Sequence, residues 1–263
     1  MPAGFPPFAT DEGQGPDPVV LLHGFGGWHG VWATVASGLG GRVLAYDLPG
    51  HGRSLEFPGA GSAKLAASAI LADLAGRGVE AAHLTGHSMG GAIAVLMAIA
   101  SPDRVLSLTL LSPGGFGEDI NGPLLRRFAA ARSPAELAAC LAGMSGPASR
   151  IDGPGLTRLA AMRARPGQTE KLVGIAEAIT RGNRQGVIGK AALDLLPMPV
   201  AVLWGRNDPV LPFGQTANLP DRFRLHPIDG AGHMLIEEAP EPVTRTIRQM
   251  ARHGPPSASA ASP

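Results

Sequence analysis

Residues 80–100 read EAAHLTGHSMGGAIAVLMAIA, and the fold prediction starts from this stretch. The apolar run EAAHLTG ends in GHSMGG (86–91), and an apolar segment of helical length follows. GHSMGG contains Gly-x-Ser-x-Gly, which marks a sharp strand-to-helix turn in some enzymes. In a chain with 37 glycines the five-residue pattern also arises by chance, so the rest of the sequence must support it. The stretch predicts a strand, a tight turn at Ser88 and a helix.

The composition indicates a globular protein that acts on a small molecule. Hydrophobic residues make up 44% of the 263 residues, enough for a sizeable core. The formal net charge of +1 argues against nucleic acid or an anionic membrane surface as a partner. The longest apolar run, AIAVLMAIA (92–100), is too short to cross a bilayer. We expect a small-molecule substrate, no nucleic acid and no membrane; the oligomeric state stays open.

Cysteine usage and the first residues favour a cytoplasmic protein. Cys140 is the single cysteine, so no intramolecular disulfide forms, and MPAGFPPFAT lacks the features of a signal peptide. Cys140 lies in a helical stretch, where we expect a buried apolar residue rather than a reactive thiol. No HExxH, CxxC or tight His/Asp cluster occurs, so we expect neither a metal nor a cofactor.

Short apolar runs alternate with segments of helical length along most of the chain. This alternation is typical of an α/β fold with a mostly parallel central sheet flanked by helices. The runs are PVVLL (18–22), RVLAYD (42–47), EAAHLTG (80–86), VLSLTLLS (105–112), PVAVLWG (199–205) and RFRLHPI (222–228). The segments that we predict as helices are 28–39, 62–77, 89–100 and 238–252.

The alternation stops between residues 113 and 192, where no convincing strand appears. We predict a helical cap there, inserted into a core formed by residues 1–112 and 193–253. Ligands of open α/β sheets bind beyond the carboxyl ends of the strands, so a cap leaving the 105–112 strand would cover the pocket. Residues 1–17 are predicted to form a Pro/Gly-rich approach to the core, and 254–263 a disordered tail.

Ser88 is the candidate nucleophile. A strained turn leaves no room for side chains beside the serine, and Gly86 and Gly90 meet that need. The following helix would offer its amino-terminal N–H groups to a developing oxyanion, with the Met89 N–H nearest.

His233 is the candidate base for Ser88. It stands in DGAGHMLIEEAP, a glycine-rich loop between the last strand and the last helix, at the carboxyl edge of the sheet. His87 adjoins Ser88 but should project the other way. A serine hydroxyl needs such a base because it is a poor nucleophile at its own pKa.

Asp208 is the candidate acid that orients His233. It follows a predicted strand in PVAVLWGRNDPVLP and so reaches the same edge of the sheet. Asp229, Glu118 and Asp119 are competing candidates. The second oxyanion donor is expected from HGFGG (23–27), where Phe25 is positioned to offer its backbone N–H.

With these residues assembled, the chain closely resembles the α/β-hydrolase fold superfamily over about residues 18–252. HGFGG, DLPGHGRS (47–54), GHSMGG, GRNDPVLP and GAGHM occur in family order at family spacing. The resemblance implies a Ser88-His233-Asp208 triad, an oxyanion hole from the Phe25 and Met89 N–H groups, and a helical cap. The substrate is not implied, because one fold hosts many reactions.

A closer resemblance lies after the strand at 105–112. SPGGFGEDINGPLL (112–125) looks like the corresponding stretch of the hydrolase-like portion of acetoin dehydrogenase acyltransferase-type proteins. Those proteins often carry a lipoyl domain with a lysine to modify. This chain departs from that pattern, since its only lysines are Lys64, Lys171 and Lys190, and we expect no room for a lipoyl domain.

Three functions follow as hypotheses. The first is a carboxylesterase-like serine hydrolase (EC 3.1.1) that cleaves a small, largely apolar ester, or a thioester, through an acyl-enzyme. The second is C–C bond hydrolysis of a diketone or meta-cleavage type substrate with the same triad. The third is a hydrolase-like protein of an acyltransferase complex without independent catalysis. Four cap residues could line the pocket but are expected mainly to pack helices together: Phe116, Phe128, Met144 and Met162.

Overall fold

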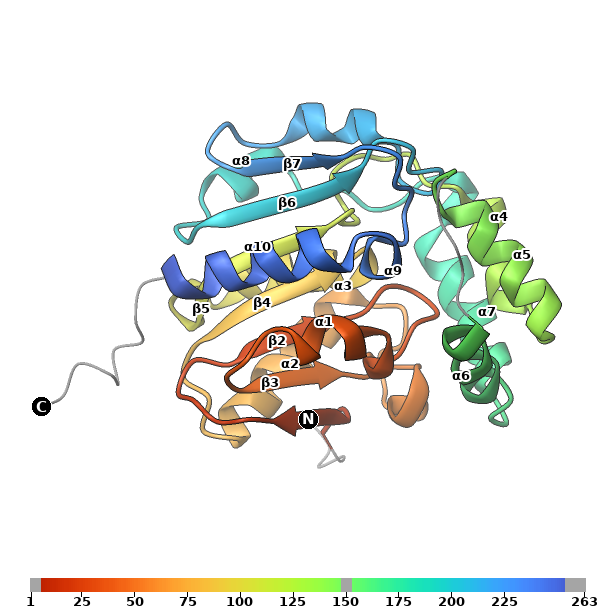
Figure 1. Ribbon diagram of the computed structural model, residues 1–263, viewed down its shortest axis with the longest axis horizontal. Helices are drawn as coiled ribbons and strands as arrows, with labels where there is room; N and C mark the ends of the chain where they lie inside the picture. The colour runs from red at the N-terminus through yellow and green to blue at the C-terminus, as the bar shows by residue number, and fades with distance from the viewer. Residues whose placement is uncertain (1–5, 148–152, 254–263) are drawn as a thin grey trace, which may run out of the picture.

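The computed structural model describes residues 6–147 and 153–253, and its strands form one sheet (Figure 1). The strand order is β1-β3-β2-β4-β5-β6-β7. Only β1 is antiparallel to its neighbour; the other adjacent pairs run parallel. The predicted α/β class with a mostly parallel sheet is therefore confirmed. The bounds are β1 (Ala9–Glu12), β2 (Val19–Leu22), β3 (Val43–Tyr46), β4 (Ala82–His87), β5 (Val105–Leu111), β6 (Val200–Gly205) and β7 (Arg224–Ile228).

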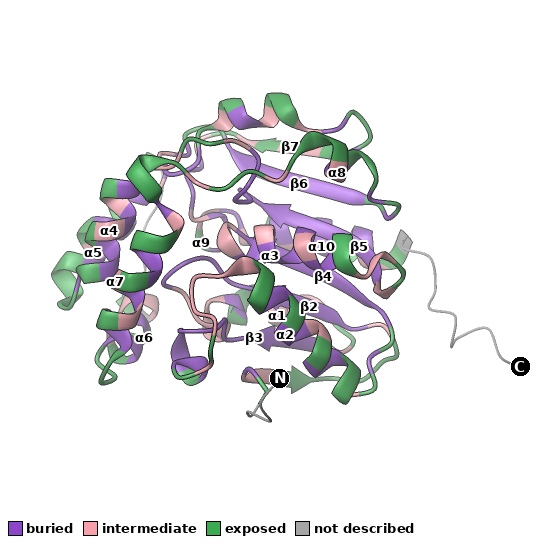
Figure 2. Ribbon diagram, turned by 180° about the vertical axis from the view of Figure 1, so that it is seen from behind, coloured by how far each residue is buried: buried purple, intermediate pink, exposed green. Residues whose placement is uncertain are grey.

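Both faces of the sheet are buried, which explains why its strands read as continuous apolar runs. In β2, Val20 and Leu22 belong to one buried cluster, and Val19 and Leu21 belong to the other. The first cluster is covered by α2 (Ala63–Gly76) and α3 (Met89–Ala100), the second by α1 (Ala33–Ser37) and α10 (Pro240–His253). Each fully buried Leu or Val stabilises the fold by about 1.5–3 kcal/mol. In Figure 2 the central strands are accordingly purple, and the helices show green outer faces.

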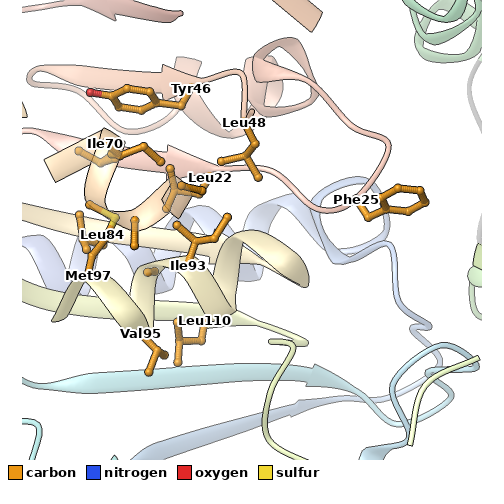
Figure 3. Close-up of a cluster of buried hydrophobic side chains, with 14 of the residues drawn as sticks. Leu22, Phe25, Tyr46, Leu48, Ile70, Leu84, Ile93, Val95, Met97 and Leu110 are labelled. Atoms are coloured by element: carbon orange, nitrogen blue, oxygen red, sulfur yellow. The ribbon is translucent and has the colours of Figure 1, made fainter. Parts of the chain in front are cut away.

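Part of the larger cluster packs between the sheet and α3, as Figure 3 shows for Leu84, Ile93 and Met97. Phe25 belongs to the same cluster but is set apart from the other labelled side chains. Its ring lies 6.3 Å from that of Phe128, which comes from a helix beyond β5. Phe25 therefore links the sheet to the helices that cover its carboxyl end.

Helices fill the interval between β5 and β6. They are α4 (Gly122–Ala130), α5 (Pro134–Met144), α6 (Gly153–Arg163), α7 (Gln168–Ile179) and α8 (Lys190–Asp194). Their starts are set by the local sequence: Asn121 caps α4, and Ser133 and Glu136 form a capping box on α5. In Figure 1, α4–α7 stand together at the end of the sheet to which the parallel arrows point. This group, called the cap below, therefore lies where ligands of open α/β sheets bind.

The structure differs from the sequence prediction at three places. Residues 9–12 form the edge strand β1, within the stretch 1–17 for which the sequence predicts only a Pro/Gly-rich approach to the core. Pairing with β3, not local propensity, orders this strand. The segment 28–39 holds a 3-10 turn and the short α1, which stops at Gly38. The helix predicted over 238–252 is α10, which begins at Pro240. The separate short helix α9 (Leu235–Glu238), which was not predicted, precedes it, and Pro240 disfavours a helical Ala239 between the two. The predicted disordered tail 254–263 lies outside the described residues.

Candidate active site

Ser88 occupies a strained turn between β4 and α3. Its φ of 52° and ψ of −115° lie in a region that non-glycine residues rarely adopt, at a cost of about 1–3 kcal/mol. The turn is held by its own backbone: the Ser88 N–H donates to the Leu111 carbonyl at 2.9 Å, and the Gly114 N–H donates to the Ser88 carbonyl at 2.9 Å. A Cβ at Gly86 would run into the backbone of Gly90. The glycines of GHSMGG are therefore required by close backbone packing.

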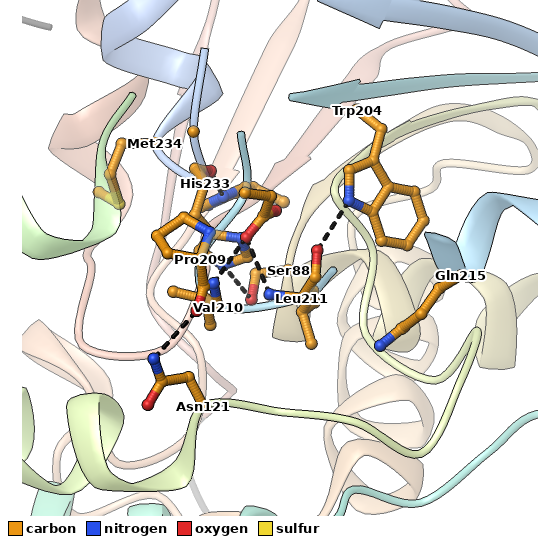
Figure 4. Close-up of polar contacts among 12 residues, drawn as sticks. Ser88, Asn121, Trp204, Pro209, Val210, Leu211, Gln215, His233 and Met234 are labelled. Atoms are coloured by element: carbon orange, nitrogen blue, oxygen red, sulfur yellow. Dashed lines mark hydrogen bonds and ion pairs between the residues drawn. The ribbon is translucent and has the colours of Figure 1, made fainter. Parts of the chain in front are cut away.

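A continuous hydrogen-bonded line joins Ser88, His233 and Asp208. His233 Nε2 lies 3.0 Å from Ser88 Oγ, and His233 Nδ1 lies 2.8 Å from Asp208 Oδ2 (Figure 4). Since a carboxylate only accepts, Nδ1 carries the ring proton and Nε2 is left to accept the Ser88 hydroxyl proton. In this tautomer Nε2 faces Ser88 Oγ and can act as a base toward it.

Asp208 is held as a buried carboxylate. Its Oδ1 accepts the backbone N–H groups of Val210 and Leu211, both at 2.8 Å. Burial acts to raise the pKa of Asp208, but the charge of His233 and these hydrogen bonds outweigh it and hold the pKa below its ordinary value. Asp208 is therefore ionised at neutral pH.

The competing acids lie elsewhere. Asp229 forms an ion pair with Arg206 at 2.7 Å, and its side chain is 89% exposed. Glu118 pairs with Arg184 on the exposed surface. The backbone carbonyl of Asp119 accepts a hydrogen bond from the side-chain amide of Gln215 at 2.7 Å. Of the four acids, Asp208 is the one that contacts His233.

The loop that carries Asp208 is fixed by residues that sequence reasoning did not single out. The Trp204 indole N–H donates to the Leu211 carbonyl at 3.0 Å, and the Asn121 side chain donates to the Pro209 carbonyl at 3.0 Å (Figure 4). Asn121 lies at the start of α4 and so ties the cap to this loop. No local sequence signal marks the Asn121 contact, because it joins residues 88 positions apart.

Two backbone N–H groups near Ser88 are free to serve an oxyanion. Within residues 6–147 and 153–253, the N–H groups of Phe25 and Met89 have no hydrogen-bond acceptor. Met89 is the first residue of α3, so the positive end of the helix dipole lies at its N–H. Both residues line a cavity that also contains Ser88. The N–H groups of Phe25 and Met89 are therefore available as the oxyanion donors that the sequence predicts.

Two cavities meet at Ser88, and Phe25 and Leu125 line both. The smaller, of about 220 Å³, also contains His233, and cap residues Phe128 and Met144 line it. The larger, of about 580 Å³, is lined mainly by apolar side chains, among them Leu96, Ile120, Ile179, Val187 and Ile188. Two further residues were considered above. The Phe116 ring, which lies before α4, has its centroid 6.4 Å from that of Trp204, and Met162 on α6 is buried. The space beside Ser88 is thus largely apolar.

Three buried neutral histidines hold the loops around Ser88. His23 Nε2 accepts the Leu48 N–H at 3.0 Å, and His51 Nε2 accepts the Gly26 N–H at 3.1 Å. His87 Nε2 donates to the His233 carbonyl at 2.7 Å, which supports the expectation that His87 projects away from the Ser88 hydroxyl. Burial lowers the pKa of His23 to about 4 and the pKa values of His51 and His87 to about 3. They are structural groups, and their roles depend on contacts far apart in sequence.

These histidines predict a protein that loses stability in mild acid. In the unfolded chain a histidine binds a proton below pH about 6.5, whereas these three stay neutral in the fold down to pH 3–4. The contribution of these histidines to the free energy of unfolding is therefore fully present above pH 6.5. Below pH 6.5 each of them lowers the free energy of unfolding by about 1.4 kcal/mol per pH unit. Urea unfolding followed from pH 7.5 to 4.5 should show this slope. His51→Gln, which keeps an acceptor for the Gly26 N–H, should lower the proton uptake on unfolding by about one; an unchanged slope would contradict the prediction.

Glu238 connects the His233 loop to the cap. Its Oε2 accepts the N–H groups of Gly232 at 2.9 Å and Gly146 at 2.7 Å, and its Oε1 accepts that of Met234 at 2.9 Å. The His233 N–H itself donates to the carbonyl of Met144 at 2.8 Å. A Cβ at Gly232 would meet the backbone of Ser145. The backbone that carries His233 is therefore fixed directly against the end of α5.

Glu238→Gln should lower turnover without preventing folding. The amide oxygen can replace Oε2, but the amide NH₂ cannot accept the Met234 N–H, so one part-buried N–H loses its partner. We expect kcat to fall about tenfold through misplacement of His233, and stability to fall by about 1–3 kcal/mol. Kinetics at a temperature where circular dichroism shows both proteins folded would measure this. The exposed Glu241→Gln on α10 is the matched control, and an equal loss in both variants would contradict the role of Glu238.

Among the residues that the structure describes, no group of three or more His, Cys, Asp or Glu side chains could hold a metal ion. Within the same residues, no helix has the length and apolar character needed to span a membrane. Cys140 is buried, and burial raises the pKa of its thiol.

Comparison with known proteins identifies the family. The sequence profile of the Alpha/beta hydrolase family matches residues 19–246. The chain belongs to the alpha/beta hydrolase family. The solved structure of a meta-cleavage product hydrolase from Pseudomonas fluorescens IP01 covers 93% of this alpha/beta hydrolase and 93% of its own chain, with a TM-score of 0.80 and 22% identity. That likeness supports the fold.

Two curated alpha/beta hydrolase relatives differ in their named activities. The dihydrolipoyllysine-residue acetyltransferase component of the acetoin cleaving system of Pseudomonas putida is 34% identical over 89% of this chain, which confirms the closer resemblance predicted from residues 112–125. This chain spans only 63% of that relative. The pimeloyl-[acyl-carrier protein] methyl ester esterase of Chromobacterium violaceum is 42% identical over 40% of each chain.

Proposed function

We propose that this alpha/beta hydrolase is a serine hydrolase that cleaves a carboxylic ester, or a thioester, of a small molecule. The observation that carries the proposal is the line from Asp208 through His233 to Ser88 Oγ, with separations of 2.8 and 3.0 Å. The strained turn at Ser88 and the free N–H groups of Phe25 and Met89 support it. Such a set suffices for acyl transfer without a metal or cofactor.

In the proposed reaction His233 Nε2 takes the proton of Ser88 as Oγ attacks the carbonyl carbon. The Phe25 and Met89 N–H groups bind the oxyanion, and ionised Asp208 stabilises the protonated imidazole. The tetrahedral intermediate collapses, and His233 gives its proton to the leaving alcohol. Water then enters, and His233 removes its proton as the water oxygen attacks the acyl carbon. The bond from that carbon to Ser88 Oγ breaks, His233 returns the proton to Oγ, and the acid is released.

Labelling with a fluorophosphonate probe, combined with a panel of p-nitrophenyl esters, tests the proposal. We expect the wild type to be labelled at Ser88 and to turn over short acyl esters, because the cavities at Ser88 are largely apolar. Labelling that vanishes in Ser88→Ala shows that the probe reacts there. A folded wild type that is never labelled would overturn the proposal.

The second candidate is C–C bond hydrolysis, and the likeness to the meta-cleavage product hydrolase is the observation that favours it. A 2-hydroxy-6-oxononadienedioate/2-hydroxy-6-oxononatrienedioate hydrolase of Cupriavidus pinatubonensis is also 38% identical over 44% of this chain. Labelled enzyme with negligible ester turnover would favour this candidate. The third candidate, a silent component of an acyl-transfer complex, predicts that neither labelling nor turnover occurs.

A further inference from the structure

Gln168, the first residue of α7, is a cap side chain that is bonded to the core at two points. It is fully buried. Its Nε2 donates to the Gly50 carbonyl at 2.9 Å, and its Oε1 accepts the Gly52 N–H at 3.0 Å. Both polar atoms of the amide are therefore in use, and they hold the residues on either side of His51.

The backbone around His51 depends on these contacts because it is intrinsically free to move. Gly50 and Gly52 have φ values of 83° and 52°, and glycine has more backbone freedom than any other residue. A Cβ at Gly50 would lie 2.7 Å from Ile175 Cδ1, so α7 packs directly on this backbone. Arg165, just before α7, donates from Nη1 to the Gly52 carbonyl at 2.8 Å. The start of α7 thus fixes the backbone on both sides of His51.

His51 passes this constraint on to the loop that carries Phe25. Its Nδ1 lies 3.2 Å from the Pro49 carbonyl oxygen, so Nδ1 carries the ring proton and Nε2 accepts the Gly26 N–H at 3.1 Å. The rings of His51 and Phe25 also meet edge to face, with centroids 6.1 Å apart. His51 therefore contacts both Phe25 and the residue after it.

The bond to Gly26 holds the central peptide of a turn. The Gly27 N–H donates to the Gly24 carbonyl at 3.1 Å, and the Gly26 φ of 74° suits the third residue of a type II turn. In a type I turn the central peptide has the opposite orientation. The bond to His51 opposes that rotation. Because this peptide joins Phe25 to Gly26, its rotation would change the backbone at Phe25.

We propose that Gln168 is a positioning residue for the Phe25 N–H, the oxyanion donor, and acts through His51 and the Gly26 N–H. This inference rests on the proposed function, and it gives the cap a part in the chemical step. Gln168 does not occur among the described residues that line the two cavities at Ser88, so it acts without touching the substrate. Oxyanion donors stabilise the transition state only when they are held where its charge develops.

A matched pair of substrates, an ester and the thionoester of the same acid and alcohol, tests the proposal. The thionoester has sulfur in place of the carbonyl oxygen, and sulfur is a weak acceptor that gains less from N–H donors. The ratio of the two kcat/KM values therefore reports on the oxyanion donors. Gln168→Met keeps the side-chain length and loses both bonds; we expect this ratio to fall about tenfold and KM for the ester to stay within about twofold. Gln168→Glu should keep part of the ratio, because one oxygen can still accept the Gly52 N–H.

Gln215→Met is the matched control. Gln215 is also buried, and its amide donates to the Asp119 carbonyl at 2.7 Å, away from residues 23–27 and 50–52. This variant should keep the wild-type ratio. The proposal is overturned if Gln168→Met leaves the ratio unchanged or lowers turnover of both substrates equally, or if Gln215→Met lowers the ratio as much. Should circular dichroism show that Gln168→Met does not fold, Gln168→Glu supplies the comparison.

Amide hydrogen exchange separates this inference from the proposed function. In Ser88→Ala protein, exchange of the Gly26 N–H followed by NMR requires no turnover. Adding Gln168→Met should speed that exchange about tenfold and leave the Gly114 N–H, which donates to the residue 88 carbonyl, unchanged. Faster Gly26 exchange in a chain whose wild type hydrolyses no ester would support the link from Gln168 to Gly26 and overturn the ester hydrolase. Ester turnover with Gly26 exchange unchanged would do the reverse.

Discussion

Ser88→Ala should lower kcat for the best ester by about 10⁴- to 10⁶-fold, the loss expected when the nucleophile of a connected triad is removed. Alanine removes the Oγ that lies 3.0 Å from His233 Nε2 and leaves the rest of the site in place. Steady-state kinetics on the best ester of the panel would measure the loss. KM should change far less, because the cavity walls are untouched.

The stability of Ser88→Ala provides the check on that result. Alanine is no better suited than serine to a φ of 52°, so the backbone strain stays and the melting temperature should move little. A large activity loss in a protein of unchanged stability identifies a chemical role for Ser88. A variant that retains more than about a tenth of the activity would contradict the proposed acyl-enzyme.

Asp208→Asn should lower kcat by about 10⁴-fold. The asparagine oxygen can still accept the Val210 N–H, but its amide group would donate to His233 Nδ1, where the carboxylate accepts at 2.8 Å. The ring proton would then lie on Nε2, and His233 could no longer accept a proton from Ser88. Kinetics together with fluorophosphonate labelling, which should slow in parallel, would measure the effect.

Asp229→Asn is the control for this prediction. Asp229 stands four residues before His233 in the sequence, and its side chain is 89% exposed and paired with Arg206. We expect its activity to stay within about twofold of the wild type. A larger loss in Asp229→Asn than in Asp208→Asn would show that the acid had been assigned to the wrong residue.

The fold class followed from the sequence because a parallel sheet buried on both faces has a characteristic pattern. Each of β2 to β7 corresponds to an apolar run, and each run ends near glycine, asparagine or proline. β1 gave no such signal, since an edge strand of four residues is ordered by its pairing with β3. The start of the last helix at Pro240 instead of residue 238 is a small difference of the kind that sequence patterns resolve poorly.

The candidate site also contains some residues that the sequence pattern marks and others that it does not. Ser88, His233 and Asp208 could be selected because each follows a strand, and the carboxyl ends of parallel strands meet at one edge. The carboxylate of Glu238, in contrast, accepts from Gly146, 92 residues away, and no local pattern records that. The burial of Arg163 could not be distinguished from the exposure of other arginines between β5 and β6, because it depends on packing against Phe128 and Gly26.

The attachment of the His233 loop to Met144 and Gly146 limits how this enzyme can be re-engineered. A chimera that takes a foreign cap from residue 113 onward would remove the acceptor of the His233 N–H and one of the three N–H groups held by Glu238. An exchange that keeps residues 144–146 and replaces only α6 and α7 would preserve both. The residues of α6 and α7 that line the cavities and the residues that hold the His233 loop thus lie in different parts of the same insertion. New specificities are best sought among those cavity-lining residues, and the end of α5 is best left unchanged.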